Sequence, residues 1–431
     1  MPPPTSNPRP GRRHDLDNLR TVCTSLVIAT HTAASYAGGG GAPPHSACFD
    51  KPSQALLPFI ATNYAYGLAL FFWLSGQMSA QSLAKAKDWD FVKSKLWRLG
   101  LPTLLYSAFL DPLRAVAMLR PGADLSAKVR AYLAEFRNFK GAPGSVWYTA
   151  TLLIFDLCAV VLRRCFALWN GRRDGFDKSE FSRLARLYGL LSRWGWIGAA
   201  AGSFLVGTKY PPGKPMPWLF VQPSCLLQYI YAYALGHMAF HLGKPRMTGM
   251  FDRLSLTRAV ALSVGTLPIL LLPGYLRGKK PESDKTDEGE KKKKKEKEEL
   301  KGDEKDFDLG GWTWTAALYA TWTEFTFNTV APAMMLTFYE NHTKPSKARL
   351  WGPRYAFAAY LLHSPVSWFI NERVDALLVP DGKRPAWMSS KLWEDLGPIL
   401  MTGAVGALDV VASFGTGLLL IDYVPGAAHI L

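Results

Sequence analysis

The residues best placed to do chemistry are an arginine and a histidine in the first long apolar stretch, Arg20 and His31. They stand eleven positions apart. A helix turns about 100° per residue, so the two side chains fall within about 20° of one face, roughly 16 Å apart along the axis. Ionisable groups inside a membrane usually face a bundle interior or a watery cavity. A neutral imidazole there can take a proton from a hydroxyl group. The alternative is a histidine that only hydrogen-bonds a neighbouring helix.

A second candidate site is basic. Lys95 and Arg98 stand three residues apart, just before Pro102 and at the beginning of the third apolar stretch. On a helix this spacing places both cations on one face, where they would clamp a phosphorylated ligand from the cytosol. The alternative is that both side chains only anchor the helix at the membrane surface.

Glu324 is a carboxylic acid without an evident partner. It lies within 322–328, a segment that carries no basic residue. We therefore expect a partner from another helix or a bound proton, and the second case leaves a proton-handling catalytic role open. The other polar positions in apolar stretches are expected to be structural, although the first pair fits a substrate contact equally well: Asp111 with Arg114, Asp156, His237 and Asp409.

Ten apolar stretches position these residues. Most are close to the length of about 20 residues that a helix needs to cross a hydrocarbon layer of about 30 Å. They predict an all-α fold, a polytopic bundle of about ten transmembrane helices. The stretches cover residues 17–37, 62–84, 99–118, 147–168, 188–206, 219–240, 256–276, 312–338, 353–371 and 397–420.

Basic residues predict the orientation of this bundle. Clusters of Lys and Arg precede the first stretch and follow the second, fourth, sixth and eighth, so all of them fall on one side. That side is expected to be cytoplasmic, together with both termini. Basic residues also occur in the opposite loop at 119–146, so the bias is strong but incomplete. We expect a multi-pass protein of the endomembrane system or plasma membrane, with the lipid bilayer as its partner.

The polar segments divide the chain further. Residues 1–16 are predicted to be a disordered cytoplasmic terminus, followed by one transmembrane domain over 17–425. A charged, disordered, extracytoplasmic loop at 277–310 interrupts this domain, because twelve basic and twelve acidic residues over 277–308 cannot bury a core. The net charge of +16 resides mainly in short loops, without a nucleic-acid-binding motif, so no nucleic-acid partner is expected. No Cys or His spacing suggests a metal site.

Several segments, in order, resemble one family. His14–Thr21 leading to His31 is similar to the first helix of the acyltransferase 3 family of integral membrane acyltransferases, where ten residues separate a basic residue from a histidine. Phe71–Gly76 resembles the family's FF-x-x-SG stretch, and Lys95–Pro102 resembles the basic beginning of its third helix. Three later segments also match in order: Val146–Phe155, Gln228–Gly236 and Tyr360–Val366.

The resemblance implies an O-acyltransferase. Such an enzyme moves an acyl group, expected to be acetyl, from cytoplasmic acyl-CoA to a hydroxyl of a glycan or small molecule on the extracytoplasmic side. By resemblance, His31 is the catalytic histidine, as general base or acyl relay, and Arg20 is its companion. Arg98, with Lys95, becomes the contact to the acyl-CoA donor.

Two more positions are carried over as substrate-binding residues, Trp147 and His363. The main alternative function is a polytopic transporter of a small molecule. Transporters usually contain internal repeats, and the two halves of this chain show no convincing similarity to each other. An acyltransferase is therefore the favoured interpretation.

Overall fold

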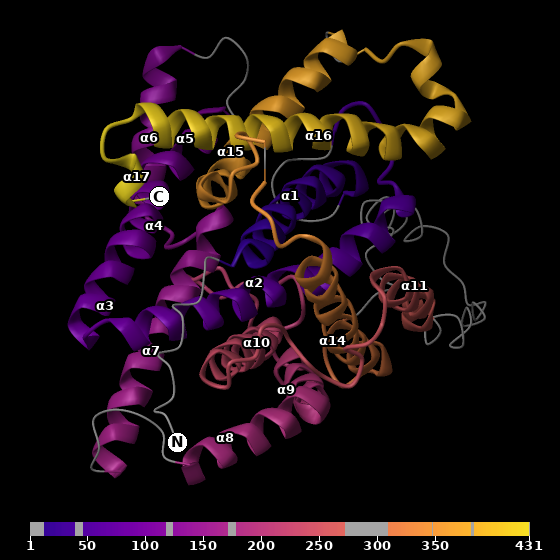
Figure 1. The fold of residues 1–431 in the computed structure, drawn as a ribbon. Helices are drawn as coiled ribbons and strands as arrows, with labels where there is room; N and C mark the ends of the chain where they lie inside the picture. The colour runs from indigo at the N-terminus through magenta and orange to yellow at the C-terminus, as the bar shows by residue number, and fades with distance from the viewer. Residues whose placement is uncertain are drawn as a thin grey trace, which may run out of the picture.

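The computed structural model describes residues 13–38, 46–117, 124–170, 178–271, 309–346, 348–380 and 383–430, and this part of the chain is all-helical (Figure 1). Within it there is no β-strand, only an isolated parallel bridge between Gly141 and Trp218. The predicted all-α class is confirmed. The predicted disordered segments, 1–16 and 277–310, lie almost wholly outside the described residues.

The helices follow the apolar stretches of the sequence. The first half contains α1 (His14–Ala37), α2 (Leu57–Lys85), α3 (Asp88–Lys95), α4 (Leu101–Leu105), α5 (Asp111–Ala117), α6 (Leu125–Arg137), α7 (Trp147–Asn170), α8 (Lys178–Leu190) and α9 (Trp196–Gly207). The second half contains α10 (Pro223–His241), α11 (Leu256–Thr266), α14 (Trp314–Asn341), α15 (Pro353–Leu378), α16 (Lys391–Tyr423) and α17 (Ala427–Ile430). Two π-helical turns, Leu96–Gly100 and Tyr106–Leu110, join α3, α4 and α5 into one column.

Three of the described helices are long and apolar enough to cross a membrane by length and composition alone. They are Gln54–Lys85, Gly144–Leu168 and Lys391–Tyr423, which contain α2, α7 and α16. A shorter apolar helix covers Leu256–Leu270. The coarse prediction of a helical membrane protein therefore holds, while the count of about ten spans and the cytoplasmic termini remain predictions.

The closest helix pair in the core is α2 against α10. Gly76 on α2 and Gly236 on α10 face each other's backbones. A Cβ on Gly76 would overlap the carbonyl of Tyr233, and a Cβ on Gly236 would overlap that of Trp73. Small residues allow such an approach between membrane helices. Gly76, the glycine of the FF-x-x-SG stretch, is therefore required for the close packing of α2 against α10.

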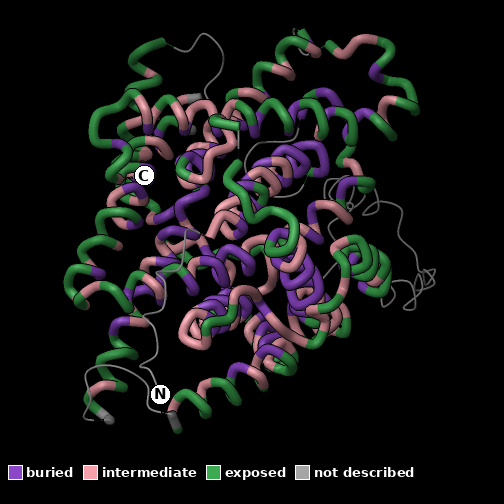
Figure 2. The backbone as a smooth tube through the Cα atoms, viewed as in Figure 1, coloured by how far each residue is buried: buried purple, intermediate pink, exposed green. Residues whose placement is uncertain are grey.

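Helix α1 lies in the middle of the molecule and packs against α2, α14, α15 and α16 (Figure 1). Figure 2 shows much of α1, α2 and α14 as buried, whereas α6 and α8 are largely exposed. Polar contacts fix the rotation of α1 on one side. Thr32 donates a hydrogen bond to the carboxylate of Asp409, and the Tyr36 hydroxyl lies 3.3 Å from the Asn371 amide oxygen. These contacts hold α1 against α15 and α16 on that side.

Candidate active site

A cavity of about 840 Å³ opens beside α1, and three of the predicted site residues line it. They are His31 from α1, Trp147 from the first turn of α7 and His363 from α15. Other walls come from α2, α5, α10 and α14, so segments from both halves of the chain build one chamber. The cavity is large enough for a small ligand, and polar side chains stand among its mostly apolar walls.

The rings of the two histidines lie next to each other in the cavity wall. Their ring centroids are 5.0 Å apart, and Tyr64 from α2 meets the His31 ring edge-on at 6.3 Å. The Nδ1 atom of His363 lies 2.5 Å from the carbonyl oxygen of Tyr360. A carbonyl can only accept, so Nδ1 carries the proton and Nε2 keeps its lone pair. This backbone contact selects the tautomer and orientation of the second imidazole.

Aromatic rings pack together at one wall of the cavity. Tyr360 lines the cavity, and behind it stand Tyr148 and Phe71, with ring centroids 5.4 and 5.9 Å from that of Tyr360. All three rings are buried. The Tyr148 hydroxyl lies 2.7 Å from that of Ser75 on α2. These three side chains, called the ring layer below, pack against one another at the wall of the His31 cavity.

Two loops, 138–146 and 211–222, form another part of the cavity wall. The amide of Ala142 donates to the carbonyl oxygen of Trp218 at 2.7 Å, which pins 138–146 against 211–222. Gly141 has a φ of +103°, and a Cβ there would overlap the Trp218 backbone, so only glycine fits. Both loops contribute to the wall, for example through Phe220 and Lys140. We call this joined pair of loops the roof.

The family comparison now decides what kind of protein this is. The family model for the acyltransferase domain (Acyl_transf_3) matches residues 13–417, nearly the whole chain. The chain belongs to the acyltransferase 3 family. The resemblance drawn from the sequence is thereby confirmed, and the protein is a membrane acyltransferase. No curated protein matches it, and neither does any solved structure.

Arg20 of this acyltransferase 3 protein does not line the His31 cavity. Its guanidinium lies 2.8 Å from the sulfur of Met78 and 3.7 Å from the carboxylate of Asp17. Met78 follows Ser75 by about one helical turn on α2, and Ser75 contacts Tyr148, so Arg20 lies near the ring layer but outside the cavity wall. Arg20 and His31 both belong to α1, but only His31 lines the cavity.

Lys95 is engaged inside the acyltransferase rather than free for a ligand. Its ammonium group is 2.8 Å from the carboxylate of Asp156 and 2.8 Å from the hydroxyl of Ser79. Asp156 is fully buried, and it also accepts a hydrogen bond from Tyr233 at 2.7 Å. Lys95 therefore neutralises a buried acid that would otherwise be very unfavourable.

Arg98 has the opposite environment. It lies in the π-helical turn that follows α3 and is exposed, with no hydrogen bond or ion pair to any described residue. The Lys95–Arg98 spacing predicted that both residues bind one ligand. In the structure, Lys95 is paired with Asp156, whereas Arg98 is exposed and has no described partner. Neither residue lines the His31 cavity.

Glu324 is placed apart from both histidines. It is buried in α14 and lines a second cavity of about 20 Å³, room for about one water molecule. One carboxylate oxygen has no hydrogen-bond partner among the described residues. Gln228 and Thr323 belong to the walls of both cavities, so Glu324 stands one layer behind the main chamber.

Two aromatic residues near the histidines were not assigned from the sequence. Tyr360 precedes His363 by three residues, a spacing that shares a helix face and was a usable signal. Tyr64 lies in the polar segment 63–66 of an otherwise apolar helix, and this was a weaker signal in the sequence. Asp111, predicted as a structural or substrate residue, also lines the cavity.

Proposed function

We propose that this acyltransferase 3 protein is an O-acyltransferase that moves an acyl group, expected to be acetyl, from cytoplasmic acyl-CoA to a hydroxyl on the extracytoplasmic side. The acceptor class is a glycan or a small molecule. The observation that carries the proposal is the imidazole of His31 in the wall of a large cavity, beside a second histidine of fixed tautomer. Acyl transfer to an alcohol needs a proton acceptor at the attacking oxygen, and this arrangement supplies one.

The reaction would proceed as follows at His31. Its imidazole takes the proton of the acceptor hydroxyl while the oxygen attacks the thioester carbonyl carbon. The carbon–sulfur bond then breaks, and the leaving thiolate takes the same proton back, so no other proton donor is needed. In the second form of the mechanism, the imidazole nitrogen attacks the thioester first, the carbon–sulfur bond breaks and CoA leaves as a thiolate. The alcohol oxygen then attacks the acyl-imidazolium, neutral His31 is released, and the proton of the alcohol goes to the thiolate. Trp147 and His363 would hold the acceptor against this centre.

The donor would approach from the opposite side of the ring layer. Arg98 is proposed to bind the anionic nucleotide end of acyl-CoA, because its guanidinium is exposed and free of described partners. The long pantetheine arm would then reach past Arg20 toward the cavity. We propose that the packed rings of Phe71, Tyr148 and Tyr360 lie on that path and move aside when the donor binds.

The topology belongs to the same proposal. We infer about ten membrane crossings, both termini in the cytoplasm and a multi-pass protein of the endomembrane system or plasma membrane. Only that orientation places the basic loops and Arg98 on the side where acyl-CoA is made. The catalytic assignment of Glu324 is retained as a secondary, proton-handling role, since it lies outside the His31 cavity.

The test uses purified full-length protein in nanodiscs with isotopically labelled acetyl-CoA and an extract of cellular glycans and lipids. We expect release of free CoA together with label in a base-labile ester. His31→Ala should lower the rate of ester formation by about 100-fold or more, the usual contribution of a general base. The matched control is His14→Ala, a histidine at the beginning of the same helix and outside the cavity.

The result separates the two function classes. A transporter would move its substrate without altering it and would show no CoA release. Equal ester formation by the wild type and His31→Ala, with both proteins folded, would remove His31 from the mechanism.

A further inference from the structure

The mouth of the His31 cavity has an apolar side. Leu113 on α5 and Phe369 on α15 both line the cavity and are about half exposed, at 50% and 57%. Leu110 and Trp368 line the cavity beside them. A large apolar side chain that is both cavity wall and surface marks the edge of an opening. We call these four residues the apolar rim.

The two helices that carry the apolar rim have different packing partners. The main packing partner of α5 is α6, whereas α15 packs on α1 and α16. The rim therefore lies at the boundary between two packing units. Elsewhere the two loops of the roof contribute Lys140 and Phe220 to the wall and are joined by the hydrogen bond from Ala142 to Trp218. The rim is the part of the wall where large apolar side chains also reach the protein surface.

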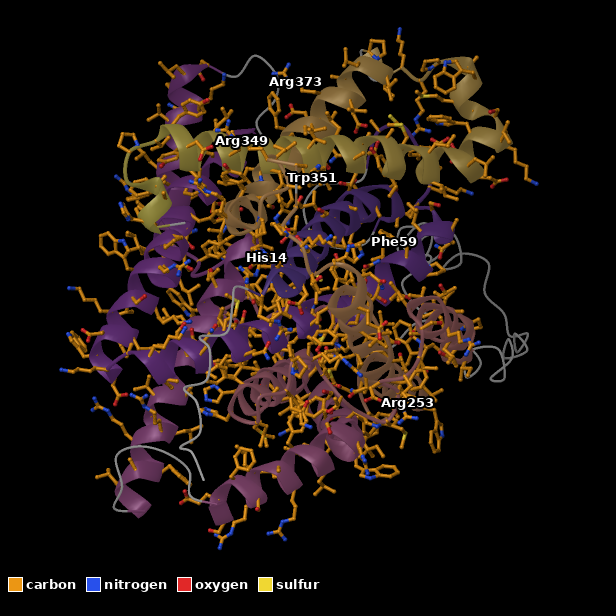
Figure 3. All side chains as sticks on the ribbon, in the orientation of Figure 1. His14, Phe59, Arg253, Arg349, Trp351 and Arg373 are labelled. Carbon is orange, nitrogen blue, oxygen red and sulfur yellow. The ribbon has the colours of Figure 1, made fainter. Side chains whose placement is uncertain are left out.

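Several polar side chains stand among the mostly apolar walls behind the rim. His31, Asn63 and Gln222 line the chamber, and Glu372 lines it on the turn of α15 next to Phe369. One further charge lies at the edge itself. The guanidinium of Arg373, labelled in Figure 3, lies over the Phe369 ring at 5.1 Å from its centroid. An exposed apolar edge, with polar side chains such as His31 and Asn63 inside the chamber, matches an amphiphile: a polar head near those side chains and a hydrocarbon tail outside.

We propose that the acceptor is carried on a membrane lipid, with its hydroxyl-bearing head in the His31 cavity and its tail crossing the apolar rim between α5 and α15. This inference rests on the proposed acyl transfer and narrows its substrate class. A freely soluble acceptor gains nothing from Leu113 and Phe369 at the mouth. The tail of a membrane lipid is already out of water in the bilayer, and Leu113 and Phe369 give it an apolar surface to cross at the mouth.

The test is photo-crosslinking in nanodiscs of phosphatidylcholine that contain a minor fraction of glucosyl diacylglycerol, a lipid whose head carries free hydroxyls. Benzoyl-phenylalanine replaces Leu113 or Phe369 in turn. The matched controls replace Leu104 on α4 and Leu419 on α16, which are equally exposed apolar residues away from the cavity. Captured lipids are identified by mass spectrometry.

We expect the glucosyl lipid to be enriched about tenfold at the two rim positions over the two control positions. The same lipid ratio at all four positions, equal to that of the bilayer, would overturn the inference. So would equal acyl transfer to methyl glucoside and to the glucosyl lipid at matched concentrations. Enrichment at the rim without acylation in any assay would support the lipid site but count against the proposed acyl transfer. A failure of the lipid site can therefore be told from a failure of the proposed reaction.

Discussion

Lys95 and Arg98 illustrate how neighbouring residues of the same charge come to differ. They stand three residues apart and look alike in the sequence. Lys95 reaches Asp156, a residue 61 positions away on α7, and this buried carboxylate takes up its charge. Arg98 meets no described partner and stays exposed. Only the fold could separate a structural cation from an available one, because the deciding acid is distant in the sequence.

Separate measurements on the two cations test this distinction. Lys95→Met should destabilise the protein strongly, by about 3–5 kcal/mol, because it leaves Asp156 buried and unpaired. Arg98→Ala should leave the thermal unfolding temperature near that of the wild type but raise the KM for acyl-CoA roughly tenfold, through loss of a charge-assisted contact. Thermal unfolding in detergent and steady-state kinetics provide the two readouts.

The double variant Lys95→Met with Asp156→Asn is the control for stability. Removing both charges should recover much of the loss, since no lone charge remains in the core. If Arg98→Ala bound acyl-CoA as tightly as the wild type, the donor role of Arg98 would be refuted.

At the scale of elements, the apolar stretches predicted the long helices, whereas α6 and α8 lie mainly in segments that were expected to be loops. Each of the ten stretches is helical over most of the residues that the structure describes, because a long apolar run satisfies its backbone only as a helix in lipid. The gathering of His31 and His363, more than 300 positions apart, had no local signal and came only from the family resemblance. The roof was not predicted at all, because its pairing depends on tertiary contact between two irregular loops.

The roof makes a sharp prediction at Gly141. Gly141→Ala introduces a Cβ into the Trp218 backbone at a φ of +103°, a conformation that costs a residue with a side chain about 1–3 kcal/mol. We expect the two loops to separate and the KM for the acceptor to rise, with donor binding unchanged. The control is Gly189→Ala on α8, where a Cβ meets nothing within 4 Å.

The measurement compares acceptor and donor KM values for the two glycine variants. A Gly141→Ala protein with wild-type acceptor kinetics would show that the roof takes no part in binding the acceptor.

At the scale of the whole molecule, Arg20 and the His31 cavity lie in different parts of the protein. The cavity is lined by His31 and His363, whereas Arg20 lies beside Met78. Arg98 also lies outside the cavity wall. The arrangement fits a reaction whose two substrates approach from different sides of a membrane.

The most direct test of this central claim is a sided assay in sealed proteoliposomes that contain protein of known orientation. Labelled acetyl-CoA is supplied only on the side of Arg98, and the acceptor extract only on the side of the roof. The account predicts a labelled ester on the roof side, with free CoA retained on the donor side, and loss of both products in His31→Ala. Ester formation only when donor and acceptor share one side, or intact acetyl-CoA crossing the bilayer, would contradict it.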